Sequence, residues 1–224
     1  MKKIYLLNDY VTSKNTLLKV EEVLNKNYPN YEIISLDFSN YYEQIEFENI
    51  NLKSTIDFFT TYLDQNIDDN DILIGIGLSS RILVKYKNNK RIYLNPLVYS
   101  NLFNVFCASK KYFENTKEQF EIYLDKFINL NLINFEKEYE WYSKYYSKIL
   151  KLTEVINLYE VLKSLKKDDS KLFLNDFKIS LSINDKIVDT KQLLKYLKSK
   201  FLKNINDFIY EVSSDKHLEI SENI

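Results

Sequence analysis

Gly75 and Gly77 are the only glycines in the chain, and both fall at the end of one aliphatic run, Ile72 to Ile76. Average usage would place about 16 glycines in a chain of this length. A chain so short of glycine uses it where a sharp turn, a positive φ angle or a close backbone approach excludes a side chain. The sequence therefore predicts a constrained turn between a buried strand and a following helix.

A carboxylate and the single histidine follow two later strand-like runs. Asp185 comes after Phe177 to Ile183, and His217 comes after Phe208 to Val212. A histidine paired with a carboxylate can move protons near neutral pH. Asp185 is equally an ordinary turn residue, and a lone histidine in a terminal loop is commonly a solvated one. Both interpretations stay open at this point.

Two kinds of periodicity alternate along the chain and define the elements that position these residues. Short aliphatic or β-branched runs predict strands, and longer patterns with apolar residues three and four apart predict helices. The expected strands are 4–7, 31–36, 72–76, 91–94, 177–183 and 208–212. The expected helices are 12–24, 52–63, 79–86 and 191–202, with a wholly helical stretch at about 112–167. This alternation predicts an α/β fold with a mostly parallel sheet, whose ligands bind beyond the carboxyl ends of the strands.

Composition and charge exclude several classes of function. The 224 residues suit one α/β domain, and 31 basic against 32 acidic residues give a net charge of −1, which predicts no nucleic-acid partner. Cys107 is the only cysteine and is expected to be a small core residue, so neither a disulfide nor a cysteine-rich metal site is expected. The apolar run near Met1 is too short for a signal peptide or a membrane span, which predicts a cytoplasmic protein without a membrane partner. No metal or cofactor is expected.

A dinucleotide-binding turn is one explanation of the two glycines. That fold requires G-x-G-x-x-G after its first strand and an acidic residue about 20 positions later. Here Gly-Ile-Gly-Leu-Ser-Ser follows the third strand, Ser80 stands at the third glycine position, and Asn95 and Pro96 occupy the later position. A Rossmann-like nucleotide binder is therefore the weakest of the alternatives.

The nucleophile elbow, G-x-S-x-G, is the second explanation. The segment Asp71-Ile-Leu-Ile-Gly-Ile-Gly-Leu-Ser-Ser-Arg-Ile resembles the α/β-hydrolase segment in which a strand runs into Gly-His-Ser-Leu-Gly-Gly. Tyr5-Leu-Leu-Asn-Asp-Tyr resembles that family's strand leading to His-Gly-aromatic, and Ile34-Ser-Leu-Asp-Phe resembles its next strand. The resemblance extends along nearly the whole chain as an order of elements. It implies a single α/β-hydrolase-like domain over residues 1–224, with a helical cap at about 108–170.

The resemblance also assigns roles to particular residues. Gly77 stands in the serine position, which leaves no nucleophile there, and Ser79 or Ser80 is the hydroxyl that could act instead. The backbone N–H groups of Leu78 and Tyr10 are the implied oxyanion donors. Asp185 and His217 follow the last two strands, which is the order that the family gives to its acid and its histidine.

Three functions follow from this reading. The first is an esterase-like or thioesterase-like hydrolase of small acyl compounds, in which Asp185 and His217 act with an atypical nucleophile or on water. The second is a catalytically inactive pseudo-hydrolase that binds a ligand or a partner. The third is the Rossmann-like nucleotide binder. The identity of the substrate and the oligomeric state are not encoded in any motif of the sequence.

Overall fold

The structure is a computed structural model that describes residues 2–96, 135–164, 177–185, 190–200, 208–213 and 220–224. The expectations for Cys107 and His217 lie outside these residues, as do the parts of the expected cap on either side of 135–164.

Six strands form one sheet in which every neighbouring pair is parallel. The order across the sheet is β2-β1-β3-β4-β5-β6, so that the first strand lies between the second and the third. The strands are β1 Lys2–Leu7, β2 Tyr31–Leu36, β3 Ile72–Ile76, β4 Lys90–Leu94, β5 Phe177–Ser182 and β6 Ile209–Val212. The predicted parallel sheet of about six strands is confirmed.

Helices connect the strands across both faces of the sheet. The α-helices are α1 Leu18–Asn27, α2 Ser39–Gln44, α3 Leu52–Asn66, α6 Phe135–Ser164 and α7 Thr190–Lys200. Three segments are 3-10 helices, η1 Lys14–Leu17, η2 Phe47–Asn49 and η3 Gly77–Lys85. Two of these differ from the prediction, because η1 takes the place of the first turns of the helix expected at 12–24 and η3 begins two residues earlier than expected. The short helix α2 was not expected at all.

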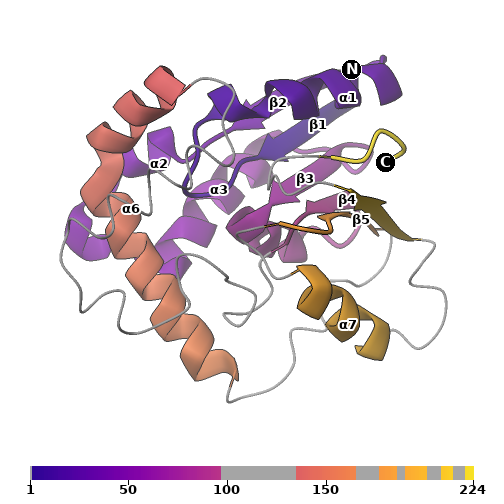
Figure 1. Cartoon of the computed structure of the whole chain (residues 1–224). Helices are drawn as coiled ribbons and strands as arrows, with labels where there is room; N and C mark the ends of the chain where they lie inside the picture. Colours follow the sequence, from indigo (N-terminus) through magenta and orange to yellow (C-terminus); the bar gives the residue numbers. More distant parts are fainter. Residues whose placement is uncertain (1, 97–134, 165–176, 186–189, 201–207, 214–219) are drawn as a thin grey trace.

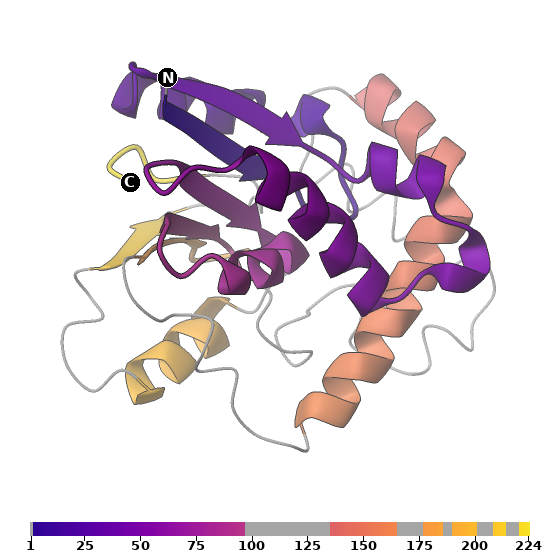
Figure 2. The same ribbon diagram turned by 180° about the vertical axis from the view of Figure 1, so that it is seen from behind.

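Two hydrophobic clusters cover the two faces of the sheet. On one face, Ile4, Ile74 and Ile92 pack with Leu17 and with Val20 of α1. On the other face, the alternating strand residues pack against α3, η3 and α7. Figure 1 accordingly shows α1 in front of the sheet, whereas Figure 2, turned by half a revolution, shows α3 in front of it. Nearly continuous aliphatic strands are the expected consequence of burial on both faces.

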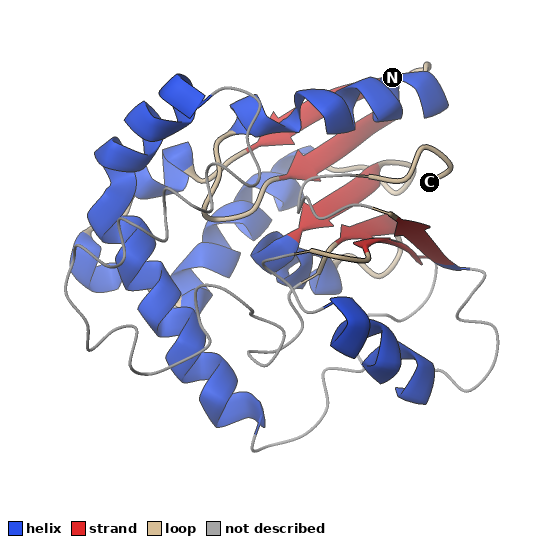
Figure 3. Cartoon of the chain, viewed as in Figure 1, coloured by secondary structure: helices blue, strands red, loops and turns tan. Residues whose placement is uncertain are grey.

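Helix α6 lies beside the edge toward which the strand arrows point (Figure 3). It is attached to the segment around α2, because Trp141 Nε1 donates a hydrogen bond of 2.7 Å to Ser39 Oγ and Lys148 Nζ donates one of 2.6 Å to the carbonyl oxygen of Ile45. Helix α6 falls inside the segment predicted to be a helical cap. Among the described helices, none is both long enough and apolar enough to cross a membrane.

Candidate functional site

The turn between β3 and η3 contains both glycines, and a side chain is excluded at each of them for a different steric reason. A Cβ atom at Gly75 would lie 2.9 Å from the backbone of Ser80, so the first glycine allows η3 to pack tightly against the end of its own strand. Gly77 has a φ angle of +53°, a left-handed conformation that side chains disfavour. The constrained turn predicted from the glycine positions is therefore present.

The space above Gly77 is occupied by the side chain of Asp9. A Cβ atom at position 77 would lie 2.3 Å from Oδ2 and 2.5 Å from Cγ of Asp9, both far inside van der Waals contact. Asp9 comes from the loop after β1 and is only 2% exposed. Its carboxyl group therefore fills the position that an elbow side chain would use.

The same carboxyl group accepts hydrogen bonds from both of the backbone donors implied by the resemblance. Asp9 Oδ1 accepts from the N–H of Tyr10 at 2.8 Å and from the N–H of Leu78 at 3.1 Å. The two N–H groups come from the segments that follow two different strands, β1 and β3, and they converge on a single oxygen atom. Their role toward a substrate oxyanion stays a prediction, but their convergence is a feature of the structure.

The loop after β1 is held by its own side chains. Asn8 Nδ2 donates to the carbonyl oxygens of Thr12 and Ser13 at 3.0 and 2.6 Å, and Asn8 Oδ1 accepts from the N–H of Asp9 at 2.8 Å. On the other side of the loop, Tyr42 OH donates to the carbonyl oxygen of Tyr10 at 2.8 Å. Burial raises the pKa of Tyr42 well above its usual value, which keeps this hydroxyl protonated as a donor. The peptide groups that surround Asp9 are consequently fixed.

The two serines that follow the elbow are engaged with the backbone. Ser79 Oγ donates to the carbonyl oxygen of Leu7 at 2.7 Å and accepts from the N–H of Ile76 at 2.9 Å, so it joins the ends of β1 and β3. Ser80 Oγ donates to the carbonyl oxygen of Gly75 at 3.1 Å. Both side chains are buried, and neither points to the position above Gly77 that Asp9 fills.

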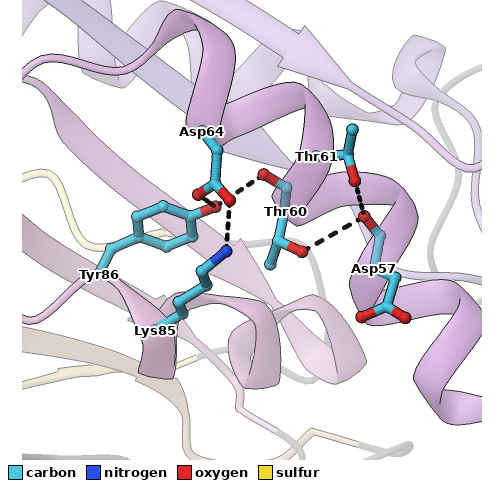
Figure 4. A network of polar contacts seen from close by, with 6 residues as sticks. All are labelled: Asp57, Thr60, Thr61, Asp64, Lys85 and Tyr86. Carbon is cyan, nitrogen blue, oxygen red and sulfur yellow. Dashed lines mark hydrogen bonds and ion pairs between the residues drawn. The ribbon is translucent and has the colours of Figure 1, made fainter.

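The far end of η3 is fixed to α3 by a polar network (Figure 4). Lys85 forms an ion pair with Asp64, and Tyr86 OH donates to Asp64 Oδ1 at 2.9 Å and to the carbonyl oxygen of Thr60 at 3.2 Å. The ammonium group of Lys85 lowers the pKa of the Asp64 carboxyl. Ser79 near its start and this network at its end therefore fix both ends of η3, the segment that follows the elbow.

Asp185 lies where the sequence predicted, in the turn that follows β5. Its N–H donates to the carbonyl oxygen of Ser182 at 3.0 Å, and the residue is 5% exposed. Its proposed partner, His217, lies outside the described residues, so the Asp185–His217 pair stays a prediction. Within the part of the chain that the structure describes, no group of histidine, cysteine and acidic side chains could hold a metal ion.

Asp9 is the site residue that sequence reasoning missed. The signal was a paired departure from the α/β-hydrolase pattern, which has glycine where this chain has Asp9 and serine where it has Gly77. Neither departure is a signal on its own, since aspartate is common after strands. Together the two departures move the side chain from position 77 to position 9, because the space between them holds only one side chain.

The architecture is that of the α/β-hydrolase fold, and solved structures agree. The chain is similar to an esterase from Exiguobacterium antarcticum, with a TM-score of 0.64 and 13% identity over 97% of this chain and 85% of that one. It is also similar to 2-hydroxy-6-oxo-6-phenylhexa-2,4-dienoate hydrolase from Rhodococcus sp. strain RHA1, with a TM-score of 0.63 and 11% identity over 97% of this chain and 84% of that one. A meta-cleavage product hydrolase from Pseudomonas fluorescens has a TM-score of 0.61 and 12% identity over 97% and 84% of the two chains.

Sequence comparison adds nothing to this assignment, because no protein-family model and no curated protein matches the chain. At 11–13% identity, the likeness to these structures establishes the fold and leaves the activity open. This protein therefore has the α/β-hydrolase fold. That Gly77 stands in the nucleophile position stays a prediction.

Proposed function

We propose that this protein uses the α/β-hydrolase fold to bind a ligand and does not perform acyl transfer through a serine. One observation carries the proposal, the Asp9 carboxyl group above Gly77, which accepts from the N–H groups of both Tyr10 and Leu78. A tetrahedral intermediate needs such N–H groups for its developing negative charge. A carboxylate in the same place opposes a second negative charge. The esterases and hydrolases of similar structure make a small acyl or carboxylate compound the ligand class to test.

Reaction with a fluorophosphonate probe tests the proposal directly. Peptide mass spectrometry on the folded protein is expected to find no adduct on Ser79 or Ser80, because both hydroxyls are buried and donate to backbone carbonyl oxygens, those of Leu7 and Gly75. The His217→Ala variant is the matched control. An adduct on either serine that disappears in His217→Ala would establish an activated serine and overturn the proposal.

Direct activation of water by Asp185 and His217 is a second candidate. It is supported by the burial of Asp185 in a turn at the carboxyl end of β5, where a carboxylate could orient a histidine. Such an enzyme would hydrolyse short acyl esters without forming a covalent adduct. Turnover that is lost in both Asp185→Asn and His217→Ala would favour this candidate, whereas a purely binding protein has no turnover to lose.

A further inference from the structure

The N–H groups of Tyr10 and Leu78 already hold a carboxyl group, and the surrounding structure is shaped to it. Both donate to one oxygen, Asp9 Oδ1, at 2.8 and 3.1 Å. Hydrogen bonds from N–H groups to an ionised carboxylate are shorter and stronger than those between neutral groups. The acceptor chemistry that this pair of donors selects is therefore that of a carboxylate oxygen.

The room for that carboxyl group comes from Gly77. A Cβ atom there would approach all three terminal atoms of Asp9, Oδ2 at 2.3 Å, Cγ at 2.5 Å and Oδ1 at 2.8 Å. Asn8 and Tyr42 fix the peptide groups on either side of Asp9, and Ser79 fixes the backbone next to Leu78 by joining it to β1. The donors therefore have supports other than the carboxyl group. A site with fixed donors and a fixed space is able to accept a free ligand of the same shape.

We propose that this donor pair is a carboxylate-binding site and that Asp9 is its tethered, inhibitory ligand. The inference rests on the proposed function, since it assumes that no serine chemistry occupies the elbow. Beyond Cα, the Asp9 side chain has the atoms of an acetate ion, and small monocarboxylates are therefore the ligand class. Because a tethered group competes at a high effective concentration, free carboxylates are excluded while Asp9 is in place.

Replacement of Asp9 by glycine tests the site by chemical rescue. The Asp9→Gly protein is expected to lose thermal stability, because two buried N–H groups are left without an acceptor. Sodium acetate should then raise its Tm in proportion to the logarithm of its concentration above the Kd, on the order of 5 °C at about 100 times the Kd, relative to sodium chloride of equal ionic strength. The wild-type protein should show no such shift.

Asp71→Gly is the matched control. Asp71 is also 2% exposed and also accepts from two backbone N–H groups, those of Lys3 at 2.7 Å and Asp68 at 2.9 Å. Those bonds use different oxygen atoms, and no glycine makes room for them. If acetate stabilises Asp71→Gly and wild type as much as Asp9→Gly, its effect is that of a general co-solvent and the proposal is overturned.

Size matching provides a second variant in case Asp9→Gly does not fold. Asp9→Ala retains Cβ, so formate should fit it better than acetate, and the yield of folded protein on refolding in formate against chloride measures the rescue. Absence of rescue in both variants overturns the carboxylate site while leaving the fluorophosphonate result, and hence the proposed function, intact. An adduct on a wild-type serine would instead overturn the proposed function itself.

Discussion

The carboxyl ends of β3 and β4 show two opposite uses of a left-handed residue. Among the described residues, Gly77 after β3 and Asn95 after β4 are the two with positive φ, at +53° and +41°. At Asn95 the residue's own side chain satisfies the neighbouring backbone and joins the ends of β4 and β5. Its Oδ1 accepts from the N–H of Ser182 at 2.8 Å, and its Nδ2 donates to Ser182 Oγ at 3.2 Å. At Gly77 the side chain is absent, and the side chain of Asp9 enters from the loop after β1.

The difference teaches what a tight turn at a strand end requires. Both turns need a residue that tolerates positive φ, and asparagine and glycine are the residues that do so most readily. What separates them is the source of the polar group that satisfies the neighbouring backbone. Substitutions that exchange these solutions should therefore have unequal effects.

The largest effect is expected at Gly77. Gly77→Ser places a Cβ atom inside the Asp9 carboxyl group and imposes positive φ on a serine, which should lower the free energy of unfolding by about 2–4 kcal/mol. In the Asp9→Gly background the same substitution should cost at least ~1 kcal/mol less, since the overlap is relieved. A double-mutant cycle by urea unfolding measures this coupling.

The double variant Asp9→Gly/Gly77→Ser also restores the α/β-hydrolase pattern at both positions. Fluorophosphonate labelling at position 77 in this variant would confirm that the elbow is in register. Additive losses of stability in the cycle would contradict the shared-space explanation.

At Asn95 a smaller loss is expected. Asn95→Ala removes the hydrogen bonds to Ser182 and imposes positive φ on alanine, for a loss of about 2 kcal/mol. Asn95→Gly removes the same bonds, but glycine tolerates the positive φ angle. The Asn95→Gly variant should therefore be more stable than Asn95→Ala by up to about 1 kcal/mol. Thermal unfolding of the two variants compares them, and equal losses would mean that the backbone angle contributes nothing.

The burial of Tyr93, which lies on β4 two residues before Asn95, predicts that the free energy of unfolding depends on pH. Burial raises the pKa of Tyr93 to about 12, with the nearby Arg91 guanidinium acting in the opposite direction. The folded protein therefore holds this proton more tightly than the unfolded chain, whose tyrosine has a pKa near 10. The stability from Tyr93 is complete below pH 10 and is lost as the pH rises toward 12, with a slope of about 1.4 kcal/mol per pH unit.

Urea unfolding between pH 9 and pH 11.5 measures that slope. Tyr93→Phe should reduce it relative to wild type. An identical slope in wild type and Tyr93→Phe would show that this tyrosine does not titrate with unfolding.

The smallest effect is expected at the other end of η3. Asp64 and Lys85 are about half exposed, and surface ion pairs contribute under ~1 kcal/mol. Asp64→Asn should therefore change the free energy of unfolding by less than that amount, and the change should shrink further at high salt. A loss comparable to that of Gly77→Ser would mean that the polar network, and not the Asp9 contact, fixes the elbow.

The strands and their parallel pairing were predictable from sequence because their signal is local. β3 is buried at every position and is aliphatic except at Gly75, and the glycine positions alone located the elbow. The helix α2, Ser39–Gln44, was missed because its six residues are too few to show a helical period. Its existence depends on tertiary contacts, such as the hydrogen bond from Tyr42 to Tyr10.

The content of the site was harder to predict than its location. The sequence indicated the Tyr10 and Leu78 donors and the turn position of Asp185, and the structure places all three at the carboxyl ends of strands. The hydrogen bond from Leu78 to Asp9 depends on a distance between residues that are 69 positions apart. No periodicity reports such a distance, and only the paired exchange at positions 9 and 77 hints at it.

The strand order has a consequence for synthesis on the ribosome. β2, β1, β3 and β4 are all contained in residues 2–96, together with Asp9 and the elbow, so the internal carboxylate contact can form early on a nascent chain. Synthesis of residues 97–224 then takes roughly 6–25 s at about 5–20 residues per second. During that interval β4 is an unpaired sheet edge, because its neighbour β5 has not yet been synthesised. A chaperone that recognises nascent hydrophobic strands should engage the chain at this edge.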